Sequence, residues 1–150
     1  GTSSIFCAVQ VARDHARRFE DERRGDGAVI GIGTDLVDLD RFRDALERTP
    51  GLVPRLFSPA EQAYAERRND PTERYAARFA AKEAVMKALG VGLGACEFTD
   101  IEVVRDEDSG APAAALRGRA AVLAEDAGVS RWLLTLTHSH AAAHAIAVAL

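Results

Sequence analysis

The sequence lacks several features that would assign it to particular protein classes. It has only two cysteines, Cys7 and Cys96, without metal-site spacing, so we expect reduced thiols in a cytoplasmic protein. It has no run of 18 apolar residues, so no membrane span is expected. No basic and then apolar leader opens the chain, and we therefore expect no secretion signal.

The chain also has no general excess of basic residues. The net charge is -4, yet residues 41–87 hold ten Lys/Arg against seven Asp/Glu, a local +3, and the rest holds nine against sixteen, a local -7. A basic middle in an acidic chain fits an anionic ligand or an acidic partner protein. It does not fit general nucleic-acid binding, which needs a strongly basic domain.

The 150 residues suit one domain, and an apolar fraction of 47% is enough to build a core. We expect residues 1–27 to form an appendage, helical over 8–24 or partly disordered, and residues 28–150 to form the domain. Helices and strands are mixed without βαβ alternation, so the expected class is α+β, an antiparallel sheet packed against a long helix. Strands are expected over 28–37, 99–105, 113–116, 131–137 and 143–150, and helices over 40–48, 59–68, 71–89 and 119–127.

Two segments carry residues suited to chemistry. Asp35 ends an apolar strand that contains two glycines, and the expected long helix places Glu83 beside Arg78, Lys82 and Lys87. Two separated acids near several cations suit Mg²⁺, or Mn²⁺, together with a phosphate-bearing ligand. Taken alone, the helix charges have an ordinary alternative reading as exposed ion pairs at a spacing of four.

Taken together, the segments 31–36 (Gly-Ile-Gly-Thr-Asp-Leu) and 78–88 (Arg-Phe-Ala-Ala-Lys-Glu-Ala-Val-Met-Lys-Ala) resemble the 4′-phosphopantetheinyl transferases. The small holo-acyl-carrier-protein synthase type is the nearest match. The resemblance runs from about residue 29 to 150, with further matches in 90–92, 101–103, 110–112, 116–120 and 139–140.

The resemblance implies transfer of 4′-phosphopantetheine from coenzyme A to a serine of a carrier protein, which releases 3′,5′-adenosine bisphosphate and supports fatty acid or polyketide synthesis. Asp35 and Glu83 would hold Mg²⁺, and Lys87 would reach a pyrophosphate oxygen. The general base is either Glu83 or a metal-bound water. By resemblance, coenzyme A contacts are expected from Arg78, Lys82, Lys87, Gly90, Gly92, Pro112 and His140, and Phe79 is either core or a wall of the nucleotide pocket.

The acceptor is either a discrete acyl carrier protein or a carrier domain of a larger synthase. We expect it to dock through Arg41 and Arg48 on the helix after Asp35, together with Arg55, because carrier proteins of this family are acidic. The alternative is that Asp44 holds these arginines in an ordinary ion pair. The family also implies a homotrimer with sites between subunits.

Three other readings compete with this one. His138, His140 and His144 would share one strand face and could form a zinc site. A metal-dependent nucleotide phosphohydrolase would use the same acids and cations. A non-catalytic coenzyme A-binding module would bind the ligand, yet replacing Glu83 would change no rate.

Overall fold

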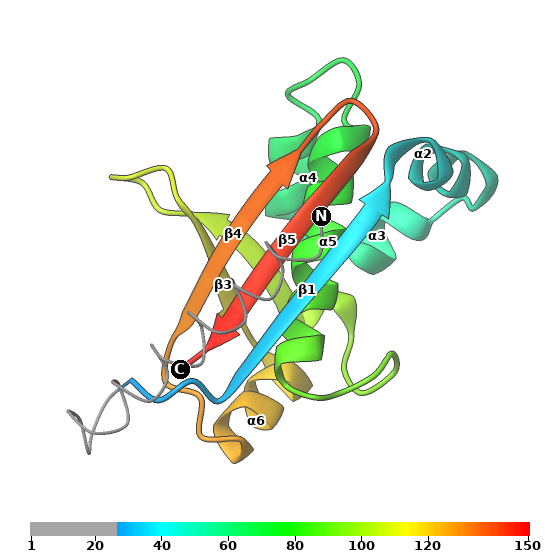
Figure 1. The fold of residues 1–150 in the computed structure, drawn as a ribbon. Helices are drawn as coiled ribbons and strands as arrows, with labels where there is room; N and C mark the ends of the chain where they lie inside the picture. Colours follow the sequence, from blue (N-terminus) through cyan, green and yellow to red (C-terminus); the bar gives the residue numbers. More distant parts are fainter. Residues whose placement is uncertain (1–26) are drawn as a thin grey trace, which may run out of the picture.

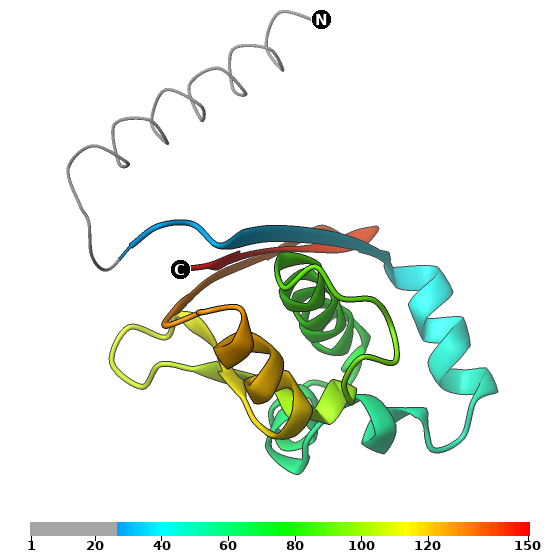
Figure 2. The same cartoon turned by 90° about the horizontal axis from the view of Figure 1, so that it is seen from below.

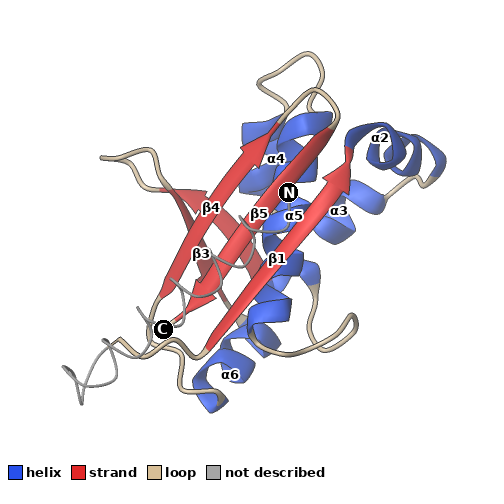
Figure 3. Cartoon of the chain, viewed as in Figure 1, coloured by secondary structure: helices blue, strands red, loops and turns tan. Residues whose placement is uncertain are grey.

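The computed structural model describes residues 27–150 as a mixture of helices and antiparallel strands (Figures 1 and 3). The elements are β1 (Gly31–Asp38), α2 (Leu39–Arg48), α3 (Leu52–Leu56), α4 (Pro59–Ala65), α5 (Thr72–Ala88), the 3₁₀ helix η1 (Phe98–Asp100), β2 (Ile101–Arg105), β3 (Pro112–Leu116), α6 (Gly118–Asp126), β4 (Trp132–His138) and β5 (Ala142–Ala149). One sheet has the order β1-β5-β4, and β2 pairs with β3 in a separate hairpin. The predicted α+β class, with an antiparallel sheet against the long helix α5, is confirmed.

Three expectations about these elements need correction. Helix α3 was not expected, because its five residues are too short to show a helical period. Helix α4 ends at Ala65 instead of 68, where Glu66 is already its C-cap. Strand β1 begins at Gly31 and not at 28. The helix expected over 8–24 lies outside the described residues, so the division into an appendage and a domain stays a prediction.

The sheet forms one layer, and α5 packs against one of its faces (Figure 2). The residues of β5 that point toward α5 are the buried alanines Ala143, Ala145, Ala147 and Ala149. Alanine and glycine on the contact face allow the helix to approach the strands closely. Met86 is buried in this layer, which confirms its predicted place in the core.

The two glycines of β1 bring that strand directly against α5. A Cβ atom added at Gly31 would overlap the carbonyl oxygen of Ala88, and one added at Gly33 would overlap that of Ala84. No side chain fits at either position, as expected for glycines where two backbones meet. This contact fixes the distance between Asp35, which lies inside β1 and not at its end as expected, and Glu83 on α5.

The opposite face of the sheet is covered by no element among residues 27–150 (Figure 2). Ile32 and Leu36 are each 68% exposed there, and Leu133 is 50% exposed. The outward residues of the three strands are Ile32, Thr34, Leu36 and Asp38 on β1, Leu133, Thr135 and Thr137 on β4, and Ala142, His144, Ile146 and Val148 on β5. Asp38, the last residue of β1, is the one carboxylate among these eleven side chains, and none of them is a lysine or an arginine. No helix of the described part is long and apolar enough to span a membrane.

Candidate active site

A groove of about 690 Å³ lies where β1, α2 and α5 meet, and we call it the carboxylate groove. Asp35 and Glu83, the two predicted metal ligands, both line it. The structure therefore brings the two sequence segments into one site. Among its other lining residues are Leu36, Arg41, Phe42, Asp44, Arg48, Phe79, Leu93 and Phe98.

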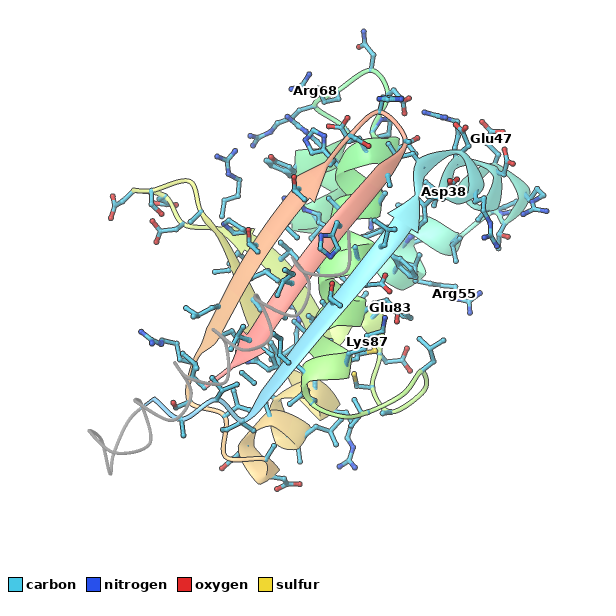
Figure 4. All side chains as sticks on the ribbon, viewed as in Figure 1. Asp38, Glu47, Arg55, Arg68, Glu83 and Lys87 are labelled. Atoms are coloured by element: carbon cyan, nitrogen blue, oxygen red, sulfur yellow. The ribbon has the colours of Figure 1, made fainter. Side chains whose placement is uncertain are left out.

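Lys87 of α5 forms a salt bridge with Asp35 of β1 and lies near Glu83 on the same helix (Figure 4). Its Nζ atom donates to Asp35 Oδ1 at 2.9 Å and to the carbonyl oxygen of Thr34 at 2.9 Å. The Lys87 side chain is still 51% exposed. Lys87 is not itself among the lining residues of the groove, but an ammonium group has three donors, so one N–H remains beside Asp35.

Glu83 presents its carboxylate to the same groove, and within residues 27–150 no hydrogen bond or salt bridge to this carboxylate is found. Burial raises the pKa of Glu83, the Asp35 carboxylate raises it further, and Lys87 lowers it. A cation placed between the two carboxylates would offset the electrostatic repulsion between them.

The donor set fits Mg²⁺, which takes one or two carboxylates and completes its octahedral shell with waters and phosphate oxygens. In the part of the chain that the structure describes, no group of three or more His, Cys, Asp or Glu residues could hold a metal by itself. Asp35 and Glu83 are therefore the residues that would hold the ion.

Phe79 forms one wall of the groove and also joins the core. Its ring centroid lies 5.4 Å from that of Phe42 and 5.3 Å from that of Phe98, with the Phe98 ring nearly parallel. The two open readings of Phe79, core and pocket wall, thus both describe it.

The basic residues predicted to bind the carrier lie on and after α2. Arg41 and Arg48 are exposed and line the groove, whereas Arg55 is exposed nearby and is not among the lining residues. Arg48 donates through Nε to the backbone oxygen of Asp44 at 3.3 Å. Among the described residues the Asp44 carboxylate forms no salt bridge with either arginine, so the ion-pair alternative finds no support.

Lys82 does not face either a groove or solvent. Its side chain is 0% exposed, and Nζ donates to Glu61 Oε2 at 2.8 Å, to the Leu56 carbonyl at 2.6 Å and to the Phe98 carbonyl at 3.0 Å. All three donors are used, so the predicted contact with a coenzyme A phosphate does not fit this position. The sequence did not reveal this burial, because a lysine among other charged residues on a helix is expected to be exposed to solvent.

Arg78 lines a second, separate hollow of about 310 Å³, which we call the arginine pocket. Arg78 is 5% exposed, and within residues 27–150 its Nε atom has no hydrogen-bond partner. Burial lowers the pKa of Arg78. Pro112, a predicted coenzyme A contact, lines the same pocket. The lining residues include Tyr64, Arg68, Glu73, Arg74, Arg78, Arg105, Gly110, Pro112, Leu136 and His138.

The three histidines at the end of the chain do not share a face. His138 pairs with the inward Ala143 and lines the arginine pocket, with Nε2 at 3.2 Å from Glu73 Oε1. His144 points to the open face, where its Nε2 lies 2.6 Å from Thr34 Oγ1. His140 is exposed in the turn between β4 and β5 and is not among the lining residues of either cavity.

His140 lines neither cavity of the described residues, so the coenzyme A contact expected of it stays a prediction, whereas the zinc reading fails on strand geometry. The alternation of β4 carried the signal for the inward position of His138, since it follows the inward residues Leu134 and Leu136 at intervals of two. Sequence reasoning also missed Tyr64, Arg74 and Arg105, which reach the pocket from three different elements.

The glycines after α5 end the helix and start a loop over the groove. Gly90 has φ +69°, and Val91 N donates to the Met86 carbonyl at 3.0 Å, which closes the helix as predicted. Neither Gly90 nor Gly92 is among the lining residues of the two cavities, but Leu93 of this loop lines the carboxylate groove and is 71% exposed.

Comparison with known proteins decides the family. The family model described as "4'-phosphopantetheinyl transferase superfamily" matches residues 31–149. The chain belongs to this superfamily. A holo-[acyl-carrier-protein] synthase of Moorella thermoacetica is 47% identical over 120 residues, covering 80% of this chain and 93% of that protein. Such curated relatives confirm the predicted family and enzyme class.

Solved structures of superfamily members have the same fold. The holo-[acyl-carrier-protein] synthase of Neisseria meningitidis is 31% identical, with a TM-score of 0.74 over 81% of this chain and 98% of that one. A holo-(acyl-carrier-protein) synthase of Bacillus anthracis in complex with CoA (3',5'-ADP) is 32% identical, with a TM-score of 0.67 over 81% of this chain and 96% of that one.

Proposed function

We propose that this protein transfers 4′-phosphopantetheine from coenzyme A to a serine of an apo acyl carrier protein or carrier domain, with Mg²⁺ or Mn²⁺, and releases 3′,5′-adenosine bisphosphate. The observation that supports this most is the meeting of Asp35 and Glu83 in a groove that also carries Arg41 and Arg48, with Lys87 paired to Asp35 beside it. The holo-[acyl-carrier-protein] synthases that resemble the chain point to the same reaction. We place the reaction in fatty acid or polyketide synthesis, and its cytoplasmic location stays a prediction.

Within the carboxylate groove, Asp35 and Glu83 would hold the metal ion, which supplies charge neutralisation at the diphosphate of coenzyme A. Lys87 would donate its remaining N–H to a phosphate oxygen. This reaction needs chiefly positioning and charge stabilisation, which these three fixed side chains supply.

The attacking serine belongs to the carrier, so the chain needs no nucleophile of its own. Glu83 is one candidate base, and its raised pKa makes it a stronger proton acceptor than an ordinary glutamate. A metal-bound water near Asp35 is the other candidate.

The arginine pocket would take the other phosphate of coenzyme A, the 3′-phosphate of its adenosine. Arg78 is a buried cation with a free N–H, and Arg74 and Arg105 border the same hollow. A phosphate monoester supplies the oxygens that such donors bind.

The two cavities of one chain do not face the same way. Arg78 and Glu83 are five residues apart on α5, which rotates their side chains by about 140° from each other. Arg68 of the arginine pocket and Glu83 are also well separated in Figure 4. We therefore propose that the groove of one subunit meets the arginine pocket of a neighbour.

A homotrimer would provide that arrangement. The sheet face with exposed Ile32, Leu36 and Leu133 offers an apolar surface for contact between copies. Light scattering that finds an active monomer at assay concentration would remove this part of the proposal.

Incubation with coenzyme A, Mg²⁺ and a panel of apo carrier proteins tests the reaction. Intact mass spectrometry should show one phosphopantetheine added to the carrier, and none when its acceptor serine is replaced by alanine. Turnover of coenzyme A without a carrier would favour a phosphohydrolase instead. Binding of coenzyme A with no transfer would favour a non-catalytic module.

A further inference from the structure

Tyr64 of α4 lies at the centre of the arginine pocket. The guanidinium carbon of Arg78 is 3.9 Å from the centroid of its ring, and that of Arg74 is 4.4 Å away. Arg105 and Arg67 follow at 5.8 Å and 5.9 Å. These distances are within the range of cation–π attraction, so one half-buried ring serves several cations at once.

Arg78, the nearest of these cations, forms no salt bridge within the described residues, and the Glu61 carboxylate acts on it only from a greater distance. It is 5% exposed, and its single hydrogen bond among residues 27–150, from Nη1 to the Arg74 carbonyl, is long at 3.5 Å. A buried charge is costly unless something stabilises it. The ring of Tyr64 is the group in position to do so.

An aromatic partner and a carboxylate differ in which groups of an arginine they leave free to bind a ligand. A carboxylate would neutralise the guanidinium and occupy the N–H groups along its edge. A ring binds the flat face of the guanidinium and leaves both its charge and its edge available. The Arg78 Nε atom without a partner is consistent with an edge kept open for a ligand.

Tyr64 also fixes the neighbouring arginines through polar atoms. Its backbone oxygen accepts a hydrogen bond from Arg74 Nη1 at 2.6 Å, and its hydroxyl lies 3.5 Å from Arg105 Nη1. Burial alone would raise the pKa of Tyr64, but the charges of Arg74 and Arg78 and the hydrogen bond from Arg105 together lower it. The cations therefore surround the ring from α5, β2 and the turn after α4.

We propose that Tyr64 is a positioning residue that holds Arg78 and Arg74, unpaired and charged, for the 3′-phosphate of coenzyme A. This inference rests on the proposed function. Tyr64 is not among the lining residues of the carboxylate groove, so its loss should act on coenzyme A affinity and not on the chemical step.

The test compares Tyr64→Leu and Tyr64→Phe with the unmodified protein, using coenzyme A and 3′-dephospho-coenzyme A as donors. Tyr64→Leu should raise KM for coenzyme A about tenfold, because the cation–π contacts are lost. With dephospho-coenzyme A, which has no 3′-phosphate, its KM should stay within about twofold of the unmodified protein. Tyr64→Phe keeps the ring and loses only the long 3.5 Å contact of the hydroxyl with Arg105, so its KM for coenzyme A should rise much less than that of Tyr64→Leu. The effect of both variants should fall on KM and not on kcat.

Three results would overturn the proposal: an equal rise in KM for both donors, no rise with either donor, or an equal loss in Tyr64→Phe, which would assign the effect to the hydroxyl group. If Tyr64→Leu does not fold, Tyr64→Gln at this half-exposed site is measured in the same way, since the ratio of the two KM values cancels a general loss. A wild-type protein that transfers from neither donor would instead refute the proposed function.

Discussion

Lys82 and Arg78 lie one turn apart on α5, and both are buried cations, yet they are stabilised in opposite ways. All three donors of Lys82 are satisfied, one of them by the Glu61 carboxylate at 2.8 Å. In the part of the chain that the structure describes, Arg78 forms no salt bridge, its Nε has no hydrogen-bond partner, and its guanidinium lies over the ring of Tyr64. A saturated buried cation can only hold the fold together, whereas an unsaturated one remains able to bind an anion.

The carboxyl groups of this region show the same difference. Glu61 accepts from Lys82 and the Ser58 backbone through Oε2, and from the Val103 backbone at 2.9 Å through Oε1, so it ties α4 to β2 and α5. Glu83, next to Lys82 in sequence, has its carboxylate in the groove and a raised pKa. Side chains with satisfied partners and side chains kept unsatisfied thus alternate along one helix.

The largest effect should come from breaking the saturated pair. Lys82→Met would leave the Glu61 carboxylate buried without its cation, and we expect a loss of about 3–5 kcal/mol in the free energy of unfolding. Urea denaturation followed by circular dichroism measures this loss. Lys82→Met with Glu61→Leu should recover most of it, because no unpaired charge remains. A stable Lys82→Met with a raised KM for coenzyme A would reverse the assignment of this lysine.

Glu83→Gln should have the opposite profile, with catalysis lost and the fold kept. We expect kcat/KM to fall about a thousandfold, since a metal ligand and a candidate base are removed. The intact-mass assay measures this fall, and Glu97→Gln on the loop after α5 serves as the exposed control. Full activity of the unmodified protein in excess EDTA would contradict the metal assignment.

The stability of Glu83→Gln should also depend on pH in a defined direction. The folded-state pKa of Glu83 is raised above its unfolded value, so the ionised carboxylate destabilises the fold at pH values above the folded pKa. Glu83→Gln should therefore be at least as stable as the unmodified protein at pH 7. Its advantage should shrink as pH falls through the folded pKa, and disappear below the unfolded one. A variant less stable at pH 7 than at pH 4, relative to the unmodified protein, would contradict this.

Arg78→Met should weaken coenzyme A binding without weakening the fold. Replacing an unpaired buried charge by an apolar side chain of similar length is close to neutral for stability. Loss of a charge-assisted hydrogen bond should cost about 1.5–3 kcal/mol of coenzyme A affinity, measured by calorimetry with 3′,5′-adenosine bisphosphate. Arg78→Lys should recover only part of this affinity, because an ammonium cannot stack flat on Tyr64. Unchanged affinity in Arg78→Met would remove the arginine pocket from the ligand site.

The sequence predicts the groove well because its residues stand in segments with strong local signals. The glycines of β1 specify a close backbone contact, and helix α5 has a clear end at Gly90, so the meeting of Asp35 with Glu83 follows from two reliable elements. The arginine pocket is harder to predict because it is assembled from long-range contacts among α4, α5, β2 and β4. Burial of Lys82 depends on such contacts too, and a helical pattern gives no sign of them.

The smallest expected effect concerns the carrier, which would meet the outer rim of the carboxylate groove. Arg41 and Arg48 are exposed, and among the described residues neither is paired with a carboxylate. They therefore resemble Arg78 in lacking an acidic partner, but they differ from it because solvent surrounds them. Solvent reduces the value of each exposed charge pair to about 0.2–1 kcal/mol. Arg41→Glu with Arg48→Glu should therefore raise KM for the carrier about tenfold at low salt, where like charges now repel the acidic partner. The rise should shrink as salt increases, while KM for coenzyme A stays constant, and Arg119→Glu with Arg131→Glu, both exposed and outside the groove, should change neither value. An equal rise in KM for coenzyme A, or unchanged carrier kinetics at low salt, would show that Arg41 and Arg48 do not bind the carrier.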